Sequence, residues 1–96
     1  MSEDEFEWDA AKSEANLAKH GVTFEAGRRV FGDVFACERC DLDSSHGETR
    51  YVITGMVNGV ILTVVYTERR DRIRIISARK ATTHEQKEYY RSQTAE

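Results

Sequence analysis

The dipeptide Asn58-Gly59 constrains the fold of this chain more than any other feature, because it stands between two β-rich runs, RYVITGMV and VILTVVYT. Both residues of a two-residue hairpin turn must adopt positive φ, and asparagine followed by glycine does so at little cost. The dipeptide therefore predicts an antiparallel hairpin in which Val57 pairs with Val60.

This register divides the hairpin into two faces, since successive side chains of a strand point to opposite sides. The more apolar face is expected to cover the core, and it carries Tyr51, Ile53, Gly55, Val57, Val60, Leu62, Val64 and Tyr66, with Tyr51 opposite Tyr66. The other face carries Arg50, Val52, Thr54, Met56, Ile61, Thr63, Val65 and Thr67. One face of an antiparallel sheet can remain in water, so this second, more polar face is the candidate working surface.

A third long strand is predicted over about residues 72–79, after the turn sequence RRDR. A loop of two or four residues would place Arg72 and Arg74 on the polar face and bury the isoleucines that follow them, as the hydrophobic pattern favours. A loop of three residues would exchange the faces and place Arg79 on the polar face instead. The sequence leaves both registers open, and Arg79, at the end of the strand, could point either way.

Helices are predicted before this sheet. The segment FEW, residues 6–8, is typical of a short strand, and Asp9 is a suitable N-cap for a helix over about residues 10–19. Gly21 is a suitable left-handed residue to end that helix. Thr23 is then placed to cap a second helix, FEAGRRVF.

A last helix is predicted after the sheet, and its start has two candidate capping boxes, Thr82 with Glu85 or Thr83 with Gln86. The order of elements is strand, two helices, three strands and a helix. It indicates an α+β fold with a small antiparallel sheet of about four strands, flanked by an N-terminal helix pair and a C-terminal helix.

Length and composition narrow the class of protein. The 96 residues contain no proline and no repeat, which favours a single domain over residues 1–96 with one modest core. No run of about 18 apolar residues is present to span a membrane, and the acidic N-terminus, MSEDEFEWDA, does not resemble a secretory signal. We therefore expect a cytoplasmic protein.

The segment CERC places Cys37 and Cys40 at a spacing known from metal and redox sites. A structural zinc site needs four ligands, and the sequence has no second cysteine pair. A redox pair would be expected at the start of a helix within a βαβ unit, which this pattern does not predict. We therefore predict neither a bound metal nor a cofactor.

Charge is unevenly distributed along the chain, whose net charge is −3. Residues 1–27 carry a net charge of −5, and residues 66–80 carry a net charge of +4. The net acidity argues against a general nucleic-acid binder, whereas the local basic segment suggests one localised anionic ligand. The alternative is that both segments are ordinary solvated surfaces.

Two blocks of sequence resemble the BrnT family of bacterial toxins. The first block, FEWDAAKSEANLAKHGVTFEAGRRVF, has the Trp-Asp opening followed by Lys12, Asn16, Lys19-His20-Gly21 and Phe24. The second block, RIRIISARKATTHEQKEYY, has an Ile-Ser-Ala-Arg strand end followed by threonine, Glu85 and Tyr89. The resemblance covers nearly the whole chain, with the order and spacing of both blocks intact.

This resemblance implies a RelE-like fold and a ribonuclease toxin that cleaves RNA and arrests translation. It also implies a partner, a BrnA-type antitoxin that resembles a ribbon-helix-helix DNA binder. The toxin would then reach its DNA operator only through that antitoxin.

The chemistry of RNA cleavage without a metal selects candidate residues. Such cleavage needs a base near the 2′-hydroxyl, a cation for the scissile phosphate and an acid for the leaving oxygen. Arg79 is the candidate phosphate clamp, because a guanidinium presents a planar fork to phosphate oxygens, and Arg50 is the candidate second clamp. His20 is the candidate for proton transfer, although a histidine at that position also complements a helix dipole.

Other residues are predicted to bind RNA or to assist. The basic residues expected to position RNA without taking part in the chemistry are Lys19, Arg72, Arg74 and Lys80. Trp8 could stack on a base or belong to the core. Glu85 and Tyr89 are candidate acids or bases, and Glu85 could equally be only a helix cap.

Two alternatives remain open at the level of sequence. The chain could be a non-catalytic module that binds its antitoxin and regulates DNA occupancy, or a degenerate toxin that kept its fold after losing activity. The acidic net charge keeps both open, because toxins of this kind are often basic.

Overall fold

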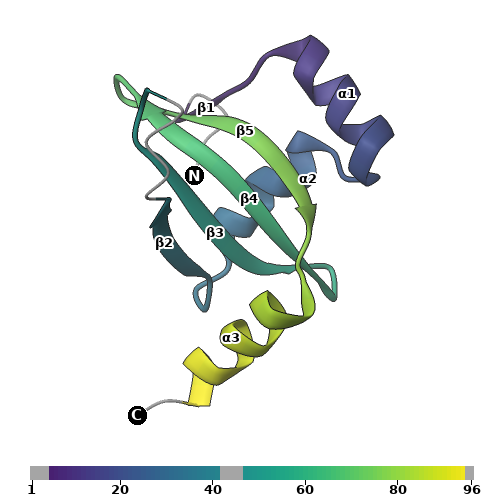
Figure 1. Cartoon of the computed structure of the whole chain (residues 1–96), viewed down its shortest axis with the longest axis vertical. Helices are drawn as coiled ribbons and strands as arrows, with labels where there is room; N and C mark the ends of the chain where they lie inside the picture. The colour runs from purple at the N-terminus through teal and green to yellow at the C-terminus, as the bar shows by residue number, and fades with distance from the viewer. Residues whose placement is uncertain (1–4, 42–46, 95–96) are drawn as a thin grey trace.

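The computed structural model describes residues 5–41 and 47–94, and these form one five-stranded sheet with helices on one face and at one end (Figure 1). The strands are β1 (Phe6–Glu7), β2 (Cys37–Asp41), β3 (Arg50–Val57), β4 (Val60–Arg69) and β5 (Arg72–Lys80), in the spatial order β1-β5-β4-β3-β2. β1 runs parallel to β5, and the other neighbours are antiparallel.

The predicted α+β class and flanking helices are confirmed, with two corrections. The sheet has five strands rather than about four, and it is mixed rather than wholly antiparallel. β2 was missed because its sequence, CERCD, is polar and mostly exposed at the edge of the sheet, so it lacks the apolar alternation that marks a strand.

The β3–β4 hairpin has the predicted register. Val57 lies opposite Val60 and Tyr51 opposite Tyr66. The turn residues have the expected positive φ, 51° at Asn58 and 82° at Gly59.

The register of β5 combines both of the predicted alternatives. Arg69 lies opposite Arg72 across a two-residue turn, which places Arg74 opposite Thr67 on the polar face. A shift of register between Val65 and Tyr66 then leaves Ile76 as an extra residue in β5. After this bulge Arg79 lies opposite Thr63, so it too lies on the polar face.

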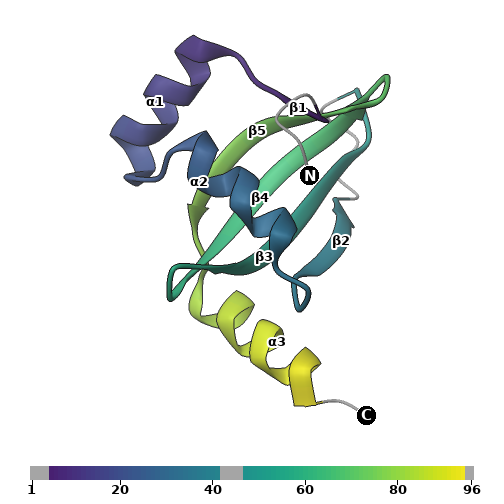
Figure 2. The same ribbon diagram turned by 180° about the vertical axis from the view of Figure 1, so that it is seen from behind.

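The helix α2 (Phe24–Arg28) and the 3₁₀ turn η2 (Arg29–Gly32) cover the apolar face of the sheet, and α1 (Ala10–His20) lies beside the β5 edge (Figure 2). The buried residues between this layer and the sheet are Phe6, Val22, Phe24, Val30, Ile53, Leu62, Val64, Tyr66, Ile75 and Ala78. The predicted caps are confirmed, since Asp9 accepts from the Lys12 amide, Gly21 adopts φ 70° and Thr23 accepts from the Ala26 amide.

Asn16 joins α1 to the edge of the sheet. Beyond the short β1 strand, β5 has a free edge, and there the Asn16 Oδ1 accepts from the Ala78 amide at 3.2 Å. Its Nδ2 donates to the Ala78 carbonyl at 2.7 Å and to the Val22 carbonyl at 2.9 Å. The buried side-chain amide thus makes the hydrogen bonds that a neighbouring strand would otherwise make with Ala78, the residue just before Arg79.

The last helix, α3 (Thr83–Thr94), crosses the end of the sheet at the β3–β4 hairpin and extends toward β2. The helix begins with the capping box of Thr82 and Glu85, one of the two predicted boxes. The Glu85 amide donates to Thr82 Oγ1, and the Thr82 amide donates to Glu85 Oε1. Ile61, Ala81 and Tyr89 form a small second core beneath it.

Asp33 fixes the far part of α3 to the sheet. Its carboxylate accepts hydrogen bonds from the Met56 amide, the Phe35 amide and the Tyr89 hydroxyl at 2.8, 2.9 and 2.6 Å. Burial alone would raise the pKa of Asp33, but these bonds outweigh it and hold the pKa below its ordinary value.

Replacing Tyr89 with phenylalanine should lower the free energy of unfolding by about 2 kcal/mol, because the variant loses a hydrogen bond to a charged group. Tyr90→Phe is the matched control, since Tyr90 is the next residue and is 51% exposed. Urea unfolding at pH 7 measures both variants. Equal stability of the two would show that the contact with Asp33 does not anchor the helix.

Candidate active site

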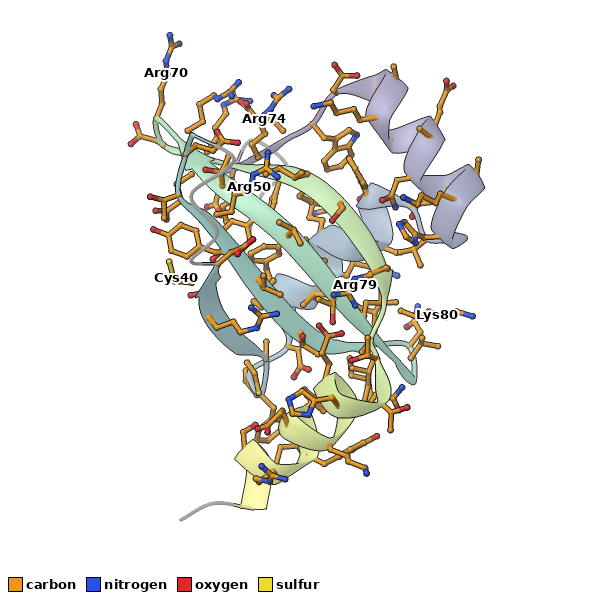
Figure 3. All side chains as sticks on the ribbon, viewed as in Figure 1. Cys40, Arg50, Arg70, Arg74, Arg79 and Lys80 are labelled. Carbon is orange, nitrogen blue, oxygen red and sulfur yellow. The ribbon has the colours of Figure 1, made fainter. Side chains whose placement is uncertain are left out.

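The polar face of the sheet, called the open face below, is the face not covered by α1 and α2 and is turned toward the viewer in Figure 1. The arginines labelled in Figure 3 lie in two places. Arg50 and Arg74 lie near the β4–β5 turn, where Arg70 also projects, and Arg79 lies toward the other end, near the start of α3.

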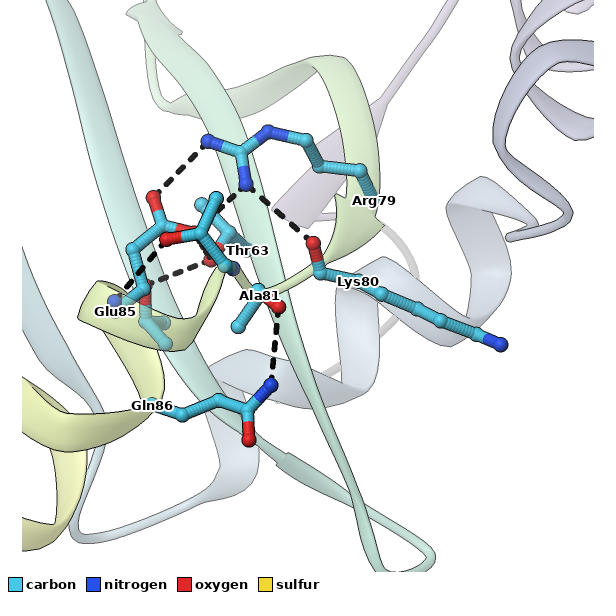
Figure 4. A network of polar contacts seen from close by, with 8 residues as sticks. Thr63, Arg79, Lys80, Ala81, Glu85 and Gln86 are labelled. Atoms are coloured by element: carbon cyan, nitrogen blue, oxygen red, sulfur yellow. Dashed lines mark hydrogen bonds and ion pairs between the residues drawn. The ribbon is translucent and has the colours of Figure 1, made fainter.

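Arg79 is held by a bidentate ion pair with Glu85 (Figure 4). Its Nη1 lies 2.7 Å from Glu85 Oε1, and its Nη2 lies 3.0 Å from Oε2. The Thr63 hydroxyl also donates to Glu85 Oε1, at 3.0 Å, and contacts the Thr54 hydroxyl at 2.9 Å. Three elements, β4, β5 and α3, thus fix the orientation of one guanidinium.

The ion pair favours the charged form of both partners. Burial tends to raise the pKa of Glu85, but hydrogen bonds from Arg79, the Thr82 amide and Thr63 lower it to about 2. The bond to Glu85 in turn raises the pKa of Arg79 despite its partial burial. At neutral pH Glu85 is therefore a carboxylate, a state suited to orienting Arg79 rather than to donating a proton.

Glu85→Gln should lower the free energy of unfolding at pH 7 by about 2 kcal/mol, since it removes a charged hydrogen-bonding partner of Arg79. The folded-state pKa of Glu85 lies below its ordinary value of 4.5, so its stabilising effect is fully present above that pH. This effect is lost as the pH falls toward about 2. Urea unfolding of both proteins should therefore show a difference that shrinks between pH 5 and pH 3, and a pH-independent difference would contradict this account.

Arg50, the predicted second clamp, does not lie beside Arg79. Arg50 is at the start of β3, where its guanidinium lies 3.3 Å from Glu48, whereas Arg79 is opposite Thr63 in the middle of the sheet. The two positions are about four residues apart along the strands, roughly 13 Å, and on strands separated by β4. The structure groups Arg50 with the arginines of the β4–β5 turn instead.

The other basic candidates are spread around the sheet. Arg74 pairs with Glu7 at 2.9 Å, and Arg72 is exposed beside the turn. Lys80 and Arg79 point in opposite directions (Figure 4). Lys80 is exposed on the other side of β5, and Lys19 is exposed on α1.

His20 lies at the end of α1, at the edge of the sheet. It is half-buried, and the Gly21 amide that follows it donates to the Leu17 carbonyl to end the helix. Within residues 5–41 and 47–94, no hydrogen bond or ion pair joins His20 to Arg79. The structure thus does not bring the two predicted catalytic residues into contact.

Two aromatic candidates have structural surroundings. Trp8 packs edge-to-face on Phe24, with ring centroids 6.0 Å apart, at the border of the main core. Tyr89 is only 3% exposed, and burial together with the bond to Asp33 raises its pKa to about 12. Both environments favour a packing role over contact with RNA.

The CERC segment is β2, so Cys37 and Cys40 are three residues apart on a strand and point to opposite faces of the sheet. Cys37 lies opposite Thr54 on the open face, and Cys40 lies opposite Tyr51. Among the residues that the structure describes, no group of three or more His, Cys, Asp or Glu side chains gathers to hold a metal ion.

A groove of about 580 Å³ lies on the open face between β2 and α3. Two of the residues that line it are basic and were not among the candidates chosen from the sequence, Arg39 of β2 and His84 of α3. The available signal was the alternation of β2, which would have placed Arg39 on the open face had the strand been recognised.

One family model matches the chain, over residues 8–85, and its description is a ribonuclease toxin, BrnT, of a type II toxin–antitoxin system. The match covers more than half of the chain and reaches from Trp8 to Glu85. The chain belongs to the BrnT family. No curated protein matches its sequence.

The resemblance seen in the sequence is thereby confirmed. A BrnT chain is a ribonuclease toxin of a type II system, and such a system implies an antitoxin partner. The matched region contains the whole sheet except the first strand, and it includes both Arg79 and Glu85. Among the described helices of this BrnT chain, none is long and apolar enough to span a membrane.

Proposed function

We propose that this protein is a cytoplasmic, metal-independent endoribonuclease that arrests translation. The observation that supports this most is the bidentate Arg79–Glu85 pair on the open face. The pair leaves the Arg79 Nε–H free of protein acceptors among the described residues, so the guanidinium can hold a phosphate while Glu85 keeps it in position.

The proposed reaction is attack of the ribose 2′-oxygen on the adjacent phosphorus, with departure of the 5′-oxygen of the next nucleotide. Arg79 stabilises the charge that develops on the phosphate oxygens. The basic residues that extend from this point toward the β4–β5 turn, Arg50, Arg72 and Arg74, would bind the rest of the RNA strand. Lys19 of α1 and Lys80 on the other side of β5 would bind RNA that passes around the sheet edge.

Sequence reasoning assigned proton transfer to His20, and the variant His20→Ala tests that assignment. If it is correct, cleavage falls by about 100-fold or more while the fold is kept. Unchanged cleavage would remove His20 from the mechanism without affecting the role of Arg79.

We also propose that a BrnA-type antitoxin of the ribbon-helix-helix class neutralises the toxin, and that the complex reaches its DNA operator through the antitoxin alone. The acidic segment of residues 1–27 suits contact with a basic partner surface.

Two observations favour a second candidate function, a non-catalytic module that binds the antitoxin. Glu85 neutralises Arg79, and the whole chain is acidic, both of which weaken attraction for RNA. The two functions differ in one measurable property, since only the ribonuclease turns over RNA.

The experiment that separates them adds purified protein to bacterial total RNA in EDTA, with and without ribosomes, and to a cell-free translation reaction. The ribonuclease proposal expects cleavage that persists in EDTA and a halt in translation. Absence of cleavage under every condition would favour the second candidate function, a non-catalytic module that binds the antitoxin.

A further inference from the structure

The groove lies on the open face with β2 on one side, α3 on the other and β3 beneath it. Its residues are Cys37, Glu38, Arg39, Val52, Thr54, Thr82, His84, Glu85, Glu88 and Ser92. The α3 residues His84, Glu88 and Ser92 recur every four positions and so share one face of the helix. Contact between Cys37 Sγ and Ser92 Oγ, at 2.9 Å, joins the two sides at the far end.

We infer that this groove holds the RNA segment that reacts, with Arg39 as a second phosphate-binding residue and His84 as the group that accepts the 2′-hydroxyl proton. The inference rests on the proposed ribonuclease function. In place of Arg50 and His20, which do not line this groove, it names two residues that line it together with Glu85.

Arg39 is suited to bind phosphate because of its position and its lack of a competing acceptor. It lies opposite Val52 on the open face and is exposed. In the described part of the chain, no carboxylate or carbonyl accepts from its guanidinium. Arg39 lines the groove itself, and Arg79 adjoins it through Glu85, which lines the groove and pairs with the Arg79 guanidinium.

His84 is suited to proton transfer because its imidazole is accessible and adjoins fixed groups. Its side chain is 82% exposed, and its Nε2 lies 4.0 Å from Glu88 Oε1. The next residue, Glu85, is held by Arg79, Thr63 and the Thr82 amide, which fixes the first turn of α3 beside the phosphate clamp. His84 thus belongs to the turn of helix that lies nearest to Arg79.

The atoms balance without an oxidant or a metal. The bond from the 2′-oxygen to phosphorus forms and the bond from phosphorus to the 5′-oxygen breaks. His84 accepts the proton of the 2′-hydroxyl, and a water molecule supplies a proton to the leaving 5′-oxygen. The hydroxide that remains from this water takes the proton from His84, which returns to its starting form. The products are a 2′,3′-cyclic phosphate and a 5′-hydroxyl end.

The test uses the full chain and compares Arg39→Ala and His84→Ala with matched exposed controls, Arg29→Ala from the opposite side of the sheet and Lys87→Ala from the same helix. Cleavage is measured on bacterial total RNA. Binding is measured by fluorescence anisotropy with a labelled 12-nucleotide RNA whose 2′-hydroxyls are methylated, so that it cannot react.

We expect Arg39→Ala to weaken binding of the methylated RNA about tenfold, because the variant loses a charged hydrogen bond to phosphate. Arg39→Lys should restore part of the lost affinity. We expect His84→Ala to bind that RNA normally and to cleave RNA about 100-fold more slowly. Both controls should match wild type.

Three results would overturn the inference. If wild type cleaves RNA and both groove variants behave like their controls, the groove is not the site, although the ribonuclease function stands. A loss of cleavage in His20→Ala but not in His84→Ala would return proton transfer to α1. Failure of wild type itself to cleave RNA would overturn the proposed function together with this inference.

Discussion

Replacing Arg79 with alanine should reduce RNA cleavage by two orders of magnitude or more, the effect expected when one preoriented donor to a developing negative charge is removed. The orientation comes from Glu85, which engages both terminal nitrogens of Arg79. Initial rates of cleavage by wild type and Arg79→Ala, measured in the same buffer with EDTA, give the ratio directly.

A loss of stability could mimic this effect, because Arg79→Ala leaves the partly buried Glu85 carboxylate without its cation. The double variant Arg79→Ala/Glu85→Gln removes that unpaired charge. It should recover stability in urea and should not recover cleavage. Recovered cleavage in the double variant would show that Arg79 serves only the fold.

Replacing Asn16 with alanine should have the largest effect on stability, a fall of about 3 kcal/mol in the free energy of unfolding. The variant leaves the amide and carbonyl of Ala78 and the carbonyl of Val22 without their partner, and each buried unsatisfied group costs about 1–3 kcal/mol where water cannot reach it. Urea unfolding followed by circular dichroism measures the change.

Lys12→Ala is the control for Asn16→Ala, because Lys12 is exposed on the same helix and should change stability by less than about 0.5 kcal/mol. Asn16→Asp keeps the shape but lacks the donor to the two carbonyls, so it should also be destabilised. Stability like that of the control in both variants would mean that water replaces the amide at the sheet edge.

The parts of the fold that depend on local chemistry could be predicted from the sequence. Asn58-Gly59 determined the hairpin register, and Asp9, Gly21 and Thr23 marked the ends of two helices, because turns and caps depend on residues close together in the chain. The capping box of Thr82 and Glu85 was also predictable, although not its choice over Thr83 and Gln86.

Features that depend on contacts between distant segments could not be predicted. The bulge at Ile76 places Arg74 and Arg79 on the same face of the sheet, and no residue type in β5 predicts this bulge. The pairing of β1 with β5 joins segments more than 60 residues apart. Within the candidate site, Arg79 could be selected from the chemistry of its guanidinium. Its pairing with Glu85, and the groove that contains Arg39 and His84, depend on the position of α3 relative to the sheet, which the sequence does not predict.

The measurement that tests the central claim most directly is the chemistry of the RNA ends left by purified wild-type protein in EDTA. Attack by the 2′-hydroxyl predicts 2′,3′-cyclic phosphate and 5′-hydroxyl ends, and a substrate with 2′-deoxyribose at the cleaved position should remain intact. Ends that carry a 5′-phosphate and a 3′-hydroxyl, or cleavage of the deoxyribose substrate, would contradict the account.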